Sequence, residues 1–124
     1  MGEMQELFAK MGEYVKMDSE LPLPEFSAYY QRVMAHLMAD YQNMDTDQLV
    51  QAKGITMIMA ANAKLRALKK DGDRKKYAKI ADKADFWQDA IKARLLKDGM
   101  TAEELDDRVE KLWAEEAPAG TDAE

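Results

Sequence analysis

The spacing of apolar residues along the chain predicts five helical segments. In the first, over residues 3–17, apolar side chains recur every three or four positions, which places them on one face of a helix. They are Met4, Leu7, Phe8, Met11, Tyr14 and Val15. Pro22 and Pro24 hold the residues before them in extended conformations, so the first helix is expected to end before them.

The second segment, over residues 24–43, has the most regular apolar pattern of the chain. Its apolar residues come two to a turn on one side, and polar or small residues occupy the other. The apolar set is Phe26, Tyr29, Tyr30, Val33, Met34, Leu37, Met38 and Tyr41. This pattern predicts an amphipathic helix with one buried face.

The third segment begins at Asp45, where Gln48 completes a capping box, and is expected to run to residue 70. It has two apolar sides, which indicates neighbours on two sides and predicts a central helix. The first side is Val50, Met57, Ile58, Ala61, Leu65 and Leu68, and the second is Leu49, Ala52, Met59, Ala60, Ala63 and Ala67. Gly54 favours a close helix crossing or a kink.

The fourth segment is expected over residues 73–98, with Asp73 as its cap and Gly99 as its left-handed stop. Its buried face is predicted to be Tyr77, Ile80, Ala81, Ala84, Trp87, Ile91 and Leu95. Only two or three residues connect it to the third segment. The two are therefore predicted to fold back as an antiparallel hairpin.

A second capping box, Thr101 with Glu104, opens the fifth segment, whose apolar stripe ends at Trp113. Residues 117–124 have no apolar periodicity and are expected to form a disordered tail. The predicted fold is an all-α bundle of five helices, built on the long hairpin, in a single domain over residues 1–116. The apolar residues on two sides of both hairpin arms also make a homodimer a hypothesis.

Composition narrows the chemistry open to this chain. It has 124 residues, 47% of them hydrophobic, with no cysteine and one histidine. Disulfides, thiolate metal sites and three-histidine zinc sites are therefore excluded, and we expect no metal or other cofactor. We find no run of about 18 apolar residues and no apolar signal segment. A cytoplasmic protein without a membrane partner is the expectation.

Charge is segregated along the chain. Residues 64–83 carry nine Lys or Arg against three Asp, a net +6, whereas the residues before them carry −5 and those after them −7. The expected basic tip of the hairpin is Lys69, Lys70, Arg74, Lys75 and Lys76. One interpretation is a tip that is solvated or that faces protein, within this chain or in a partner, with Lys69 and Lys70 complementing a helix dipole. The other is a surface that contacts phosphates.

Phe86 is predicted to lie opposite the buried face of the fourth segment, on a side that it shares with Ala90 and Ala93. An aromatic on a stripe of small residues indicates that another helix packs there, from this chain or from a second copy. The ten methionines fit an irregular core, and they would equally suit an adaptable binding surface.

Candidate catalytic residues are few. His36 has Asp40 four residues later as a carboxylate to orient it, but this arrangement also fits a histidine paired along its own helix. The chain has no nucleophile elbow and no Gly-rich phosphate loop. The first hypothesis is therefore a non-enzymatic protein-interaction or assembly module that binds a protein partner or itself. The alternative is a nucleic-acid-associated protein that contacts phosphates through the basic tip.

Overall fold

The chain folds into an all-α bundle, as the apolar pattern predicts. A computed structural model describes residues 2–17, 20–69 and 72–116. Its five α-helices are α1 (Glu3–Val15), α2 (Leu23–Asp40), α3 (Thr46–Ala67), α4 (Arg74–Lys97) and α5 (Ala102–Glu116), and the short 3-10 helix η1 (Tyr41–Asn43) follows α2. The described residues include no β-strand.

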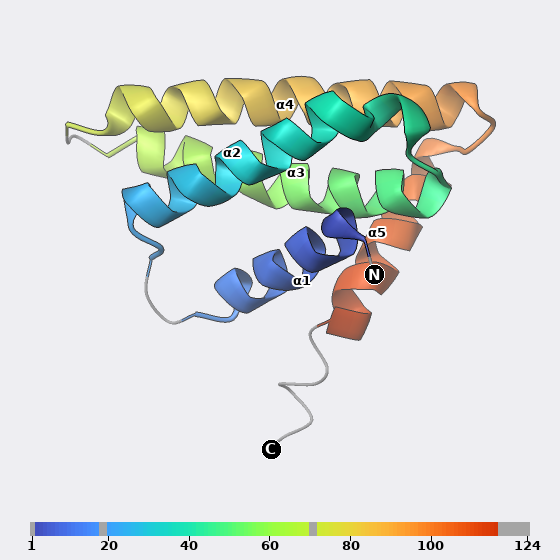
Figure 1. Cartoon of the computed structure of the whole chain (residues 1–124), viewed down its shortest axis with the longest axis horizontal. Helices are drawn as coiled ribbons and strands as arrows, with labels where there is room; N and C mark the ends of the chain where they lie inside the picture. The colour runs from blue at the N-terminus through green and yellow to red at the C-terminus, as the bar shows by residue number, and fades with distance from the viewer. Residues whose placement is uncertain (1, 18–19, 70–71, 117–124) are drawn as a thin grey trace, which may run out of the picture.

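Helices α3 and α4 form the predicted antiparallel hairpin, and α3 is central (Figure 1). Helix α4 lies along one side of α3, and α1 and α5 pack against the opposite side. Helix α2 crosses in front of the hairpin. The expectation that the third helix is the central one is therefore confirmed.

Large side chains carry the packing of α2 against its neighbours. At its N-terminal end, the rings of Phe26 and Tyr77 meet edge to face at 5.5 Å. Just beyond its C-terminal end, Tyr41 packs against Trp87 at 5.2 Å in the same way. Toward α1, the Tyr29 hydroxyl donates a hydrogen bond to the Leu7 carbonyl. Aromatic rings therefore fill the space between α2 and α4, and one hydrogen bond joins α2 to α1.

Gly54 marks the point where α1 and α5 approach α3 most closely. A Cβ built on Gly54 would lie 3.1 Å from Trp113 Nε1 and 3.2 Å from Phe8 Cε1. The rings of Phe8 and Trp113 stack above it with centroids 4.1 Å apart. Of the two expectations for Gly54, a close helix crossing is therefore the one the contacts support.

The predicted helix ends hold to within a few residues. Both capping boxes form, between Asp45 and Gln48 and between Thr101 and Glu104, and Gly99 has the positive φ of 112° expected of a left-handed stop. Asp73 takes the N-cap position of α4 without a side-chain capping bond. Helices α1 and α3 end earlier than expected. Lys70 and the expected tail, 117–124, lie outside the described residues.

Some residues expected to be buried are exposed instead. They are Val15, Met38, Met57, Ala61, Leu65 and Leu68. On α3 the reason is that α1 and α5 cover Val50 and Gly54 in its N-terminal half but leave the C-terminal half of the same side open. The prediction that both apolar sides of the third helix are covered is therefore wrong for half of one side.

We predict that Gly54→Leu lowers the free energy of unfolding by about 2 kcal/mol, because the new side chain must displace the stacked rings of Phe8 and Trp113. Urea denaturation followed by tryptophan fluorescence would measure it. The matched control is Gly72→Leu, since Gly72 is exposed and a Cβ there meets nothing within 4 Å. Equal stabilities of the two variants would contradict a close crossing at Gly54.

Candidate functional site

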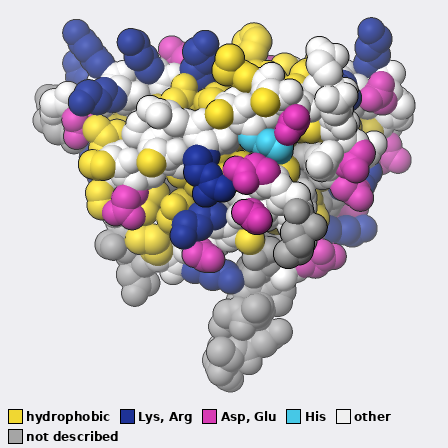
Figure 2. Space-filling model, in the orientation of Figure 1, with side chains coloured by type: hydrophobic (Ala, Val, Ile, Leu, Met, Phe, Trp, Pro, Cys, Tyr) yellow, Lys and Arg dark blue, Asp and Glu magenta, His cyan; other side chains and the backbone are white. Residues whose placement is uncertain are grey.

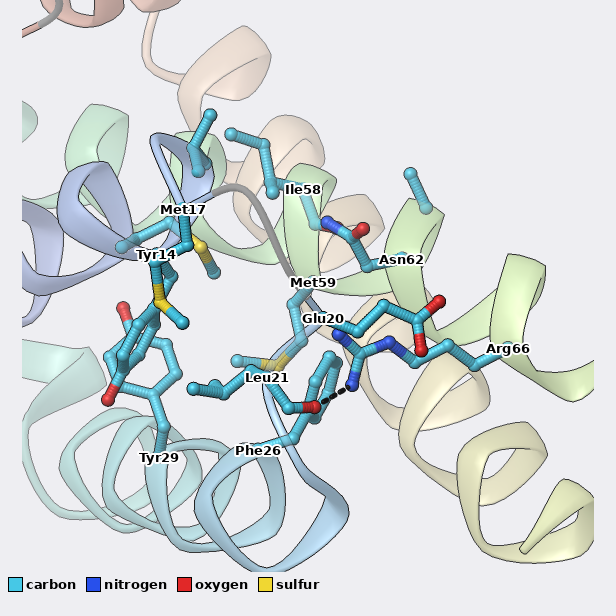
Figure 3. A pocket seen from close by; sticks show the side chains of 13 residues that line it. Tyr14, Met17, Glu20, Leu21, Phe26, Tyr29, Ile58, Met59, Asn62 and Arg66 are labelled. Atoms are coloured by element: carbon cyan, nitrogen blue, oxygen red, sulfur yellow. Dashed lines mark hydrogen bonds between the residues drawn. The ribbon is translucent and has the colours of Figure 1, made fainter.

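An apolar groove opens between the C-terminal end of α1, the connection to α2, and α3 (Figure 3). Its cavity volume is about 510 Å³, within the range of ligand-binding pockets. The lining residues are Met11, Tyr14, Val15, Met17, Glu20, Leu21, Phe26, Tyr29, Ile58, Met59, Ala61, Asn62 and Arg66. Apolar side chains from three elements thus face a common space.

Arg66 closes one end of the groove and is only 8% exposed. Its Nη1 donates hydrogen bonds to the Leu21 carbonyl at 2.6 Å and to the Tyr77 hydroxyl at 3.2 Å. Its guanidinium also lies 4.6 Å from the centroid of the Phe26 ring. These contacts fix the connection between α1 and α2 to the hairpin, so Arg66 has a structural role in shaping the groove.

One ion pair lies at the groove, and a second joins α3 to α4. Glu20 forms an ion pair with Lys69, and this hydrogen bond lowers the pKa of the Glu20 carboxyl. Along α3, Lys64 Nζ lies 2.8 Å from Asp85 Oδ2, and the bond from Lys64 lowers the pKa of Asp85. The one carboxylate among the described lining residues of the groove, Glu20, is therefore neutralised by Lys69.

An uncovered apolar strip on α3 continues from the groove to the end of that helix. We define the α3 strip as Met57, Ala61, Leu65 and Leu68, whose side chains are spaced three or four residues apart. Leu65 is 63% and Leu68 77% exposed. Because Ala61 also lines the groove, the two features form one continuous apolar surface.

The five residues of the predicted basic tip have different surroundings in the structure. Lys69 is paired with Glu20, and Lys70 is outside the described residues. Arg74, Lys75 and Lys76 are exposed in the first turn of α4, and none forms an ion pair with a described carboxylate. The residues of the predicted tip therefore do not form a single site. Its described cations without an ion pair, Arg74, Lys75 and Lys76, all lie on α4.

Phe86 is 63% exposed, and its described ring contact is with Trp87, at 5.6 Å. Ala93 is exposed and Ala90 half-buried on the same side of α4. No described helix packs over Phe86, so the expected neighbour is not a described part of this chain. Lys79 and Lys83 precede Phe86 by seven and three residues, which puts all three on one face.

This face of α4 connects the predicted basic tip with the predicted interface at Phe86, which were predicted separately. Figure 2 shows Lys and Arg side chains along the upper edge of the molecule, over α4, with hydrophobic side chains between them. The seven-residue spacing between Lys79 and Phe86 could have shown this connection in the sequence. The groove could not be found in that way, although Arg66, four and seven residues after Asn62 and Met59, stands out as a charge beside apolar positions.

A buried lysine joins a row of polar contacts between the hairpin arms. Lys53 Nζ donates to Gln88 Oε1 at 3.0 Å, and Gln88 Nε2 in turn donates to Asp85 Oδ1 at 2.8 Å. Burial of the ammonium lowers the pKa of Lys53, and the positive charge of Lys92 adds to the effect. Lys53 does not line the groove.

His36 contacts Asp40, the partner expected one helical turn later on the same helix. Its Nδ1 lies 3.2 Å from Asp40 Oδ2, whereas its buried Nε2 has no hydrogen-bond partner within the described structure. The histidine does not line the groove.

Neither a metal site nor a similar protein identifies a function for the described part of this chain. Among the described residues, no group of three or more His, Cys, Asp or Glu side chains is placed to bind a metal ion. None of the described helices is both long and apolar enough to cross a membrane. No family model, curated protein or solved structure matches this chain.

We predict that Arg66→Met lowers the free energy of unfolding by about 2 kcal/mol, because the Leu21 carbonyl and the Tyr77 hydroxyl lose their buried donor. Arg66→Lys should not restore stability, because an ammonium cannot reproduce the planar contacts of a guanidinium. Chemical denaturation would measure both. Lys69→Met, which breaks an exposed ion pair, is the control and should change stability by less than about 1 kcal/mol. An equal effect at both positions would contradict the role assigned to Arg66.

Proposed function

We propose that this protein is a non-enzymatic interaction and assembly module that binds a second copy of itself through the α3 strip and the groove. The observation that carries this proposal is the exposure of Leu65 and Leu68 beside a continuous apolar groove. Contiguous exposed apolar surface of this kind is typical of protein-interaction sites.

The shape of this surface supports self-association. The α3 strip projects from a helix, whereas the groove beside it is concave and shares Ala61 with the strip. A two-fold related copy could place its strip against the groove of the first copy while offering its own groove in return. Such an isologous contact needs only one surface that is complementary to itself.

The charges around this surface also support a second copy as the partner. The chain has a formal net charge of −6, which opposes self-association in general. However, Glu20, which lines the groove, is paired with Lys69, and Lys64, next to Leu65 of the α3 strip, is paired with Asp85. The acidic residues of α5, at the other end of α1, are remote from it (Figure 1). Two copies meeting here would therefore experience little repulsion between like charges.

We predict a concentration-dependent dimer that the double substitution Leu65→Glu, Leu68→Glu weakens about 100-fold or more, since each change loses the burial of one leucine. Sedimentation velocity over a wide concentration range would measure the dissociation constant. Both positions are exposed in the monomer, so the variant should keep the circular dichroism spectrum of the parent chain.

Two control variants locate the interface. Met38→Glu alters another exposed apolar residue, 75% exposed on α2, and should leave the dimer intact. Phe86→Asp tests the face of α4 that carries Ala90 and Ala93, and it too should leave the dimer intact. A parent chain that stays monomeric at the highest concentration would overturn the proposal. Loss of the dimer in Phe86→Asp alone would move the interface to α4.

A further inference from the structure

The outer face of α4 carries four lysines and one exposed aromatic in a single row. Lys75, Lys79 and Lys83 are spaced four residues apart, and Lys76 lies seven residues before Lys83. All four are exposed, as is Phe86, which follows Lys79 by two helical turns. We call these five residues the α4 stripe.

The lysines of the α4 stripe do not serve the stability of the helix that carries them. Lys75 and Lys76 are in its first turn, where the helix dipole disfavours positive charge, and that turn contains no acidic residue. Lys75–Lys79 and Lys79–Lys83 are like-charge pairs at four-residue spacing, which are also unfavourable. None of the four has an ion-pair partner among the described carboxylates, although Asp73 at the N-cap position complements the helix dipole.

The other cations of residues 64–83 behave differently. Lys64 and Lys69 are held by Asp85 and Glu20, and Arg66 is buried against aromatic rings. Of the described cations in residues 64–83, the fold thus pairs or buries Lys64, Arg66 and Lys69 and leaves those of α4 open to solvent. A row of unpaired cations on one face is the electrostatic pattern expected of a surface that binds phosphates.

We propose that the α4 stripe binds single-stranded nucleic acid, with its lysines on the phosphates and the Phe86 ring stacked on an unpaired base. Phe86 favours a single strand because a base offers its flat face to a side chain only when it is unpaired.

Recognition of this kind would be independent of sequence. The stripe offers ammonium groups and one ring, and these make no specific pattern of hydrogen bonds to base edges. With four phosphates neutralised, affinity for a single strand should fall roughly 50-fold between 50 and 200 mM salt. The contact is separate from the proposed dimer, because Ala61 of the α3 strip shares the groove with residues of α1, which packs on the side of α3 opposite α4 (Figure 1).

Fluorescence polarization with labelled oligo-dT, a single-stranded RNA of mixed sequence and a DNA duplex would test the proposal at low and near-physiological salt. We expect salt-sensitive binding of the single strands. The triple substitution Lys75→Glu, Lys79→Glu, Lys83→Glu should weaken it at least about tenfold. Phe86→Leu should weaken single-strand binding about tenfold, whereas Phe86→Tyr, which keeps a ring, should retain it.

The matched control is the triple substitution Lys10→Glu, Lys92→Glu, Lys111→Glu, which changes the net charge equally at exposed lysines outside the stripe. It should retain single-strand binding to within about threefold. An equal loss in both triple variants would overturn the proposal, as would no binding of any oligonucleotide at low salt. Binding to vesicles containing phosphatidylserine without binding to oligonucleotides would assign the stripe to a lipid surface instead. None of these outcomes depends on whether the chain forms a dimer.

Discussion

The crowding around α3 is the constraint on which the rest of the structure depends. This helix meets α4 on one side and both α1 and α5 on the opposite side. Small residues make this possible: Ala52, Ala60 and Ala63 are buried on α3, and Gly54 admits the rings of Phe8 and Trp113. Because interiors are close-packed, a larger residue at Gly54 would separate three helices at once.

The same crowding determines where apolar surface remains open. Helices α1 and α5 converge at Gly54, in the N-terminal half of α3, and α1 ends at Val15. No described helix continues over the C-terminal half, so Leu65 and Leu68 stay exposed and the groove forms beside them. The polar support is local as well, because Arg66 fixes one interhelical connection and Arg94 fixes another through the carbonyls of Tyr41 and Met44.

The helices were predictable from sequence because their signals are local. Capping residues such as Asp45 and Thr101, and the glycine at position 99, act within one turn of the chain. Coverage of a helix face is different, because Val50 and Leu65 have equivalent periodic positions but only Val50 is buried. What separates them is the length and direction of α1, which no periodicity in α3 encodes. The groove escaped prediction for this reason. The spacing of Lys79 and Phe86 could have shown the α4 stripe, but its residues were divided between a predicted basic tip and a separate predicted interface at Phe86.

Segregated charge and segregated apolar surface have a common origin in the hairpin. Its α3 arm is enclosed on several sides, so its cations are drawn into contacts with Asp85, Glu20 and the rings around Arg66. The α4 arm is enclosed mainly by α3 and α2, and no described neighbour on its outer face pairs with Lys79 or covers Phe86. Each arm therefore leaves a different surface to solvent: an apolar one on α3 and a basic one with an exposed ring on α4. Since the apolar surface adjoins α1 and the basic one lies on α4, which packs on the opposite side of α3, occupation of one leaves the other accessible.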